Sequence, residues 1–227
     1  MGLEITLSAI AHEQFYESLE AALILKTLVT ACGFGNAETI AALSVPISEL
    51  ANQEDGTVYV TDVDLHKGGL RHMFGDDQPD EVLGRTRELW LNFMGMAYGP
   101  EGDRFRLALR AVEASRYAYD PRFALAALWV APEAIFAKDP SEATFRLSAA
   151  WAAFAHELGE ERLQLQKRLQ KLYGFRSKAV HGHRLDAKQF ESAYRETFVL
   201  FMSSLWKLVS SGELLTAEEF QSRIFLQ

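Results

Sequence analysis

The sequence predicts a mainly α-helical protein whose N-terminal half contains one short β-hairpin. Apolar residues recur every three to four positions through most of the chain, which is the helical period. Residues that cap helices stand where the expected helices begin, at Asp120 before Pro121, at Asp186 and at Thr216. Only the stretch 57–65 alternates β-branched and polar residues in the manner of a strand.

The N-terminal half is expected to be rich in helix around that strand. Its expected helices cover about 13–31, 37–43, 81–97 and 104–118. Because a single strand is not stable alone, we expect its partner near Glu4–Leu7 or in another subunit. A glycine–proline break at 99–102 separates the last two helices.

The C-terminal half is expected to be a helical bundle. Its helices cover about 121–136, 141–157, 160–181 and 186–209, with a short one after Thr216. Pro132 lies inside the first of them and should kink or interrupt it. We divide the chain into an N-terminal region, 1–118, of unassigned role and a C-terminal helical domain, 119–227.

The composition limits the classes of function. A chain of 227 residues with 48% hydrophobic residues is long and apolar enough for its own core. Cys32 is the only cysteine, which excludes an internal disulfide and predicts a reducing cytoplasm. No stretch approaches the roughly 18 apolar residues of a membrane span, so no membrane partner is expected. The net charge of −8 argues against a protein that coats nucleic acid non-specifically.

The best functional candidates lie in the helix expected at 160–181. One face of it, about 60° wide, is formed by Leu158, Leu165, Leu169, Leu172 and Arg176. An arginine cannot lose its proton, so on an apolar face Arg176 needs an anionic partner, a bound anion or an interface. His181 lies about 140° further round. The two side chains therefore converge only if the helix loosens near Gly182 or a second copy faces the first.

Positive charge is concentrated around this pair. The cations of the span are Arg162, Lys167, Arg168, Lys171, Arg176, Lys178 and Arg184, with no Asp or Glu among them. A solvated helix face has the same appearance. Ser177 lies one turn before His181, where its hydroxyl could fix the tautomer of the imidazole. Tyr173 is expected either to pack in the bundle or to stack on a base.

An arginine, four residues and a histidine thus end this helix within the stretch 172–182, which reads Leu-Tyr-Gly-Phe-Arg-Ser-Lys-Ala-Val-His-Gly. Together with the stretches 129–136 and 144–148, it resembles the HEPN domain family, the higher-eukaryote and prokaryote nucleotide-binding helical domains, in the abortive-phage-infection-like branch. The resemblance covers roughly 119–210. It implies a homodimeric, metal-independent endoribonuclease, a hydrolase, or an RNA-binding effector. It also implies a role in antiviral defence against phage, in stress response or in a toxin–antitoxin pair, with RNA and an antitoxin or other protein as partners.

The resemblance makes Arg176 and His181 the catalytic residues, supported by Ser177, Tyr173, Lys178 and His183. Their chemistry is coherent with RNA cleavage without a metal. Attack of a ribose 2′-hydroxyl on the adjacent phosphate needs proton transfer, which a histidine supplies, and positive charge, which an arginine supplies. A family homodimer places two such pairs in one cleft, which would remove the separation of 140°.

The alternative is a non-catalytic helical protein for dimerisation or interaction. Arg176 would then be an interface ion-pair residue, His181 a helix cap and Glu133 a carboxylate that pairs with a neighbouring helix. His181 and His183 are a weak metal signal without cysteine, so neither a metal nor another cofactor is expected. His183 stands where some family toxins carry a tyrosine for nucleotidyl modification, so that modification is not expected.

Overall fold

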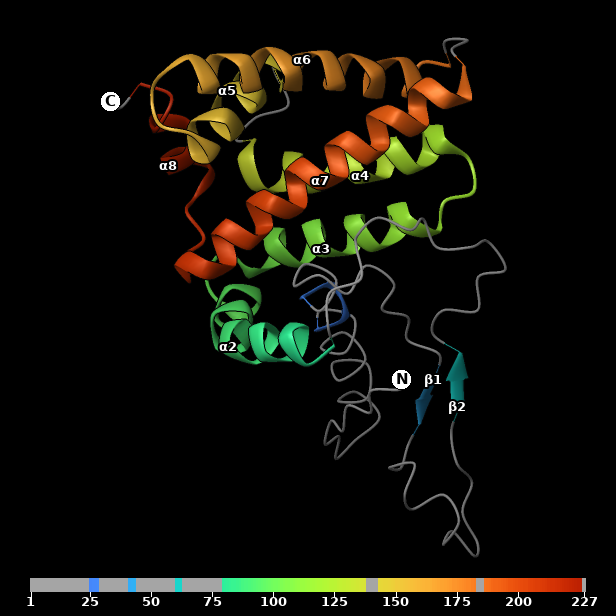
Figure 1. Ribbon diagram of the computed structural model, residues 1–227, viewed down its shortest axis with the longest axis vertical. Coiled ribbons are helices and arrows are strands. Elements are labelled where there is room, and N and C mark those ends of the chain that lie inside the picture. The colour runs from blue at the N-terminus through green and yellow to red at the C-terminus, as the bar shows by residue number, and fades with distance from the viewer. Residues whose placement is uncertain are drawn as a thin grey trace, which may run out of the picture.

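The computed structural model describes residues 25–28, 41–43, 60–62, 79–137, 143–182 and 186–225, and this part of the chain is mainly α-helical, as predicted (Figure 1). Its elements are β1 (Ala41–Leu43), β2 (Val60–Asp62), α2 (Pro79–Tyr98), α3 (Gly102–Tyr117), α4 (Pro121–Phe136), α5 (Ala143–Ala155), α6 (Glu160–Val180), α7 (Ala187–Ser211) and α8 (Ala217–Ser222). Residues 25–28 form a helical turn inside the first expected helix.

The short hairpin is made by β1 and β2, which pair antiparallel with Ala41 opposite Asp62. The strand expected within 57–65 is confirmed at Val60–Asp62. The helix expected over 37–43 is wrong at 41–43, and the partner of β2 is β1 rather than Glu4–Leu7, a segment that lies outside the described residues. A helix this short repays little of its nucleation cost, whereas strand pairing satisfies backbone groups of both segments.

Side-chain caps begin three helices where the sequence predicts them. Asp120 accepts a hydrogen bond of 2.8 Å from the backbone N–H of Arg122 at the start of α4. At the start of α7, Asp186 accepts one of 3.1 Å from the backbone N–H of Lys188. The start of α8 is a capping box, in which the Thr216 hydroxyl accepts from the N–H of Glu219 and the Glu219 carboxylate accepts from the N–H of Thr216. These bonds satisfy N–H groups that the first turn of a helix leaves free.

Pro132 does not interrupt α4, which continues to Phe136. The residues around it in the last turns, Ala131, Ile135 and Phe136, are buried with it. Burial against α3, α6, α7 and α8 outweighs the roughly 3 kcal/mol that a proline costs inside a helix. The expected interruption is therefore absent because tertiary packing holds both sides of the proline.

The core lies around α4, which contacts α3, α5, α6, α7 and α8. At its centre the Trp151 ring stacks on Phe136, with centroids 5.5 Å apart, and meets Trp129 edge-on. The α3–α4 contact is the most extensive in the fold, so the helices on either side of the expected boundary after residue 118 share one core. In Figure 1, α6 runs along one edge of the bundle and α7 crosses it obliquely. None of the described helices is both long and apolar enough to cross a membrane.

Candidate functional site at the end of α6

The apolar face of α6 is buried inside the chain. Leu165, Leu169 and Leu172 are at most 8% exposed and belong to the core. Leu158, expected on the same face, is 64% exposed and precedes the helix, because α6 begins at Glu160 after the N-cap Gly159. The leucine face therefore packs against other helices of the same chain and is not free to meet a second copy.

Arg176, the polar residue on that face, has an anionic partner. Its Nη2 lies 3.1 Å from Oε1 of Glu133 on α4 and donates a hydrogen bond of 3.3 Å to Oε2. Both side chains are about a quarter exposed, at 25% each. Of the three explanations that the sequence allowed for an arginine here, the structure contains the ion pair, with the carboxylate for which a pairing role was expected.

Tyr173 completes a cluster that joins α4 to α6. Its ring lies edge-on to Trp129 with centroids 5.2 Å apart, and the Arg176 guanidinium lies 5.4 Å from its centre. Burial raises the pKa of the Tyr173 hydroxyl, and the negative charge of Glu133 raises it further. The tyrosine thus packs in the bundle, as one of its two expected roles requires. We call Trp129, Glu133, Tyr173 and Arg176 the α4–α6 cluster.

His181 lies at the opposite side of the helix end. It is the C-cap of α6, and its side chain is exposed. Its backbone N–H donates a hydrogen bond of 3.0 Å to the carbonyl of Ser177. Gly182 follows with a φ of +70°, the left-handed conformation that ends many helices. Because α6 is helical up to Val180, it does not loosen early enough to turn His181 toward Arg176. Ser177 contacts His181 through the backbone, and His183 lies outside the described residues.

The other cations of α6 divide into two groups. Arg168 pairs with Glu196 of α7, and Arg162 donates to the carbonyls of Arg223 and Ile224 after α8. Lys167, Lys171 and Lys178 are exposed, and Lys178 lies 5.4 Å from the ring centre of Phe175. Within the described ranges, no three His, Cys, Asp or Glu side chains are grouped so that they could hold a metal ion.

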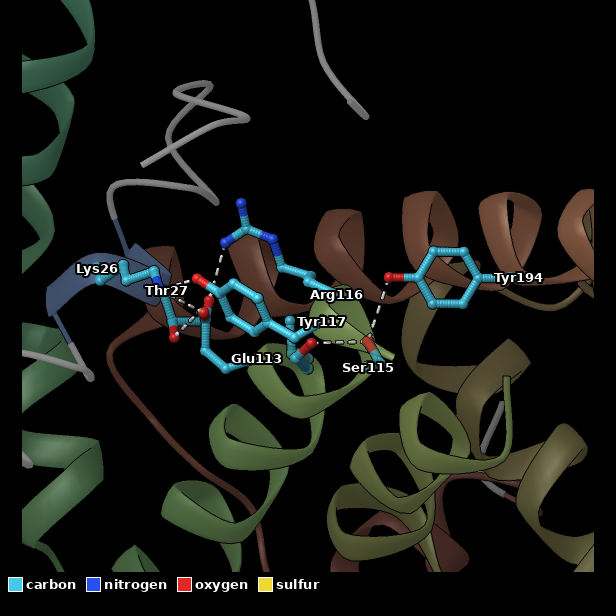
Figure 2. Close-up of polar contacts among 8 residues, drawn as sticks. Lys26, Thr27, Glu113, Ser115, Arg116, Tyr117 and Tyr194 are labelled. Carbon is cyan, nitrogen blue, oxygen red and sulfur yellow. Dashed lines mark hydrogen bonds and ion pairs between the residues drawn. The ribbon is translucent and has the colours of Figure 1, made fainter. Parts of the chain in front are cut away.

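Sequence reasoning missed a second polar cluster, which fastens residues 25–28 to α3 (Figure 2). Lys26 Nζ donates a hydrogen bond of 2.5 Å to the Tyr117 hydroxyl, and the same nitrogen lies 3.0 Å from Oε2 of Glu113. Arg116, 1% exposed, donates 3.0 Å to Oε1 of the same carboxylate. Lys26 lies about 90 residues before Glu113 and Tyr117, so no local spacing indicates these two contacts, whereas Arg116 and Glu113 are three residues apart on α3. Burial of two cations against one carboxylate makes this cluster part of the frame that supports α3.

No family model matches the chain, and comparisons with curated proteins and with solved structures also give no match.

Proposed function

We propose that this protein is a metal-independent endoribonuclease or RNA-binding effector, and that RNA binds at the C-terminal end of α6. The observation that carries the proposal is an exposed histidine, His181, at the end of a helix that has no carboxylate after Glu161. Imidazole titrates near neutral pH and suits proton transfer to or from ribose and phosphate oxygens.

Arg176 is proposed to supply positive charge to the phosphate that reacts. Its side chain is a quarter exposed, and Nη2 is the nitrogen that pairs with Glu133. Within one chain Arg176 faces α4 while His181 faces solvent, so a complete site needs a second copy to bring an arginine near a histidine. The homodimer is therefore part of the proposal. Its interface would involve the exposed end of α6, because the leucine face is internal.

The physiological part of the proposal rests on the resemblance to the HEPN family and on the single cysteine. The setting is cytoplasmic phage defence or stress response, with an antitoxin or another protein partner that controls activity. Light scattering of the purified chain tests the assembly, and a dimer at micromolar concentration is expected. A monomer at that concentration would contradict the composite site.

The chemistry is tested with a single-stranded RNA in EDTA. Cleavage should persist without divalent ions and leave 2′,3′-cyclic phosphate ends. His181→Ala should slow single-turnover cleavage by about 10²- to 10⁴-fold while RNA affinity stays within a few-fold. His156→Ala is the matched control, because His156 is a partly exposed histidine that lies 3.3 Å from Glu161 at the other end of α6. Activity that EDTA abolishes and Mg²⁺ restores, or cleavage by His181→Ala at the wild-type rate, would contradict the mechanism.

The ion pair between Arg176 and Glu133 favours the second candidate, a non-catalytic helical interaction protein. In that case Arg176 stabilises the contact between α4 and α6, and His181 only ends a helix. A dimer or a stable complex with a protein partner would then form, and no RNA cleavage would occur under any condition. The EDTA experiment with the two histidine variants separates the two candidates.

A further inference from the structure

Four side-chain positions and one glycine form a continuous ridge along α6. Lys167, Lys171, Gly174, Lys178 and His181 follow one another at alternating spacings of four and three residues. At about 100° per residue they occupy roughly 80° of the helix circumference, opposite the buried leucine face. We call these five residues the α6 ridge. Because the leucines face the core, the ridge points away from it.

The four side chains of the ridge are open to solvent, and Gly174 between them is partly buried. Lys167, Lys171, Lys178 and His181 are all exposed, and α6 lies along an edge of the bundle (Figure 1). Gly174 lies between the second and third lysines, and a Cβ built on it would meet nothing within 4 Å. Nothing in the described part of the chain therefore needs a glycine at this position for packing.

Glycine is an unfavourable residue in the interior of a helix, because its backbone loses more freedom on folding than that of alanine. One reason to keep it is the close approach of another molecule. Because Gly174 has no side chain, it leaves the helix backbone uncovered between Lys171 and Lys178, which are about 10 Å apart along the helix axis. A partner can approach the helix backbone at Gly174 while Lys171 and Lys178 contact the partner on either side.

The electrostatics around the ridge favour an anionic partner. Among the described residues, the three ridge lysines have no carboxylate partner, and α5 beside α6 contains no acidic residue. Two carboxylates on neighbouring helices do contact α6, but Glu196 is paired with Arg168 and Glu133 with Arg176. The positive charge of the lysines is therefore not neutralised by the surrounding helices, although the whole chain carries −8.

We infer that the α6 ridge is the track along which single-stranded RNA lies on its way to His181. The three lysines would contact phosphates, the sugar–phosphate backbone would approach closest at Gly174, and the scissile phosphate would lie at the histidine. A single strand fits because the ridge is narrow and convex, about 20 Å from Lys167 to His181. Single strands also leave the ribose free to align its 2′-hydroxyl for attack. This inference rests on the proposed function and names the form of its substrate.

The lysines are tested by a triple variant, Lys167→Gln with Lys171→Gln and Lys178→Gln, in the His181→Ala background so that RNA is not cut. Three phosphate contacts to a single strand contribute about 2 to the slope with which log affinity falls against log salt concentration. In fluorescence anisotropy the triple variant should lose this part of the slope, and its RNA affinity should be about 50-fold lower at 0.15 M salt. The control variant carries Arg87→Gln, Arg195→Gln and Arg223→Gln, exposed arginines elsewhere that change the net charge equally. Its affinity should fall by no more than a few-fold.

The close approach of RNA at Gly174 is tested by Gly174→Gln. Glutamine adds an uncharged side chain to the ridge and favours helix more than glycine does. RNA affinity should fall about fivefold or more while the unfolding midpoint does not decrease. Gly84→Gln is the matched control, because Gly84 is an exposed glycine in α2 whose Cβ direction is also empty within 4 Å. Its RNA affinity should equal that of the parent.

The outcomes separate the track from the proposed function. If the ridge variants bind RNA like their controls while His181→Ala abolishes cleavage, the track is wrong and the ribonuclease stands. Tighter binding of a duplex than of a single strand of the same sequence would overturn the single-strand assignment. If the parent protein binds no RNA, both the track and the proposed function fail.

Discussion

The ion pair between Arg176 and Glu133 allows the structural and functional roles of the arginine to be measured separately. The perturbation is a double-mutant cycle with Arg176→Ala, Glu133→Gln and the two changes combined. Arg176→Ala removes the cation, whereas Glu133→Gln breaks the ion pair but keeps the arginine and leaves an amide oxygen that can accept a hydrogen bond. Both variants therefore disturb the α4–α6 cluster, and only one removes charge that RNA could use.

The magnitude follows from the geometry. At 3.1 Å, two unit charges attract by about 1.3 kcal/mol in water and about 5 kcal/mol at an effective dielectric constant of 20, before the cost of desolvation. Exposed pairs measure only about 0.2–1 kcal/mol. Because both side chains are a quarter exposed, we expect a coupling of about 1 kcal/mol. Arg176→Ala should cost about 2 kcal/mol in all, since the contact with the Tyr173 ring, worth about 0.5–1 kcal/mol, is also lost.

The assay is urea unfolding of the whole chain, with the same four proteins then tested for RNA binding. If Arg176 only joins α4 to α6, Arg176→Ala and Glu133→Gln should change RNA binding alike. If it also meets phosphate, Glu133→Gln should keep or raise RNA affinity while Arg176→Ala lowers it. A coupling energy indistinguishable from zero would mean that the pair does not help to hold the two helices together.

Two further predictions concern the stability of the bundle. Trp151 Nε1 donates a hydrogen bond of 2.7 Å to the hydroxyl of Ser204. Ser204→Ala should therefore leave a buried donor unpaired and lower the free energy of unfolding in urea by about 1–3 kcal/mol. Ser203→Ala, on the exposed side of α7, should lower it by less than about 0.5 kcal/mol. Hydrogen bonds from the backbone and hydroxyl of Thr216 lower the pKa of Glu219 below its ordinary 4.5. As the pH falls, the Glu219 carboxylate therefore takes up its proton in the unfolded chain before it does so in the folded protein. The contribution of Glu219 to stability is present above pH 4.5 and is lost as the pH falls through the folded pKa. The urea midpoint of Glu219→Gln should accordingly fall less between pH 6 and pH 3 than that of the wild type, and an equal fall would contradict the cap.

The helices and their starts could be predicted because their causes are local. Asp120, Asp186 and Thr216 cap helices with hydrogen bonds to residues two or three positions later, so the pattern is visible in a few letters of sequence. The same holds for the buried face of α6, since a helical period puts Leu165, Leu169 and Leu172 together. Leu158 was misplaced because periodicity continues across Gly159, whereas the helix does not.

Contacts between distant segments could not be predicted in this way. The strand β2 pairs with Ala41–Leu43, a segment whose composition also suits a helix, and three residues have too little pattern to decide. Pro132 remains inside α4 because other helices hold it. Lys26 and Glu113 meet through the docking of 25–28 on α3, which no spacing in the chain indicates. The resemblance to the HEPN family and the catalytic roles of Arg176 and His181 stay predictions.

The order of residues alone places leucines and Arg176 on one side of α6 and lysines and His181 on the other, and it indicates that the arginine needs a partner. Those properties depend on the rotation of 100° per residue, which is the same in any helix. The choice of Glu133 as partner, rather than an anion or a second chain, depends on how α4 and α6 cross in the folded protein. Such a crossing is set by the packing of side chains from many helices at once, so it cannot be read along one of them.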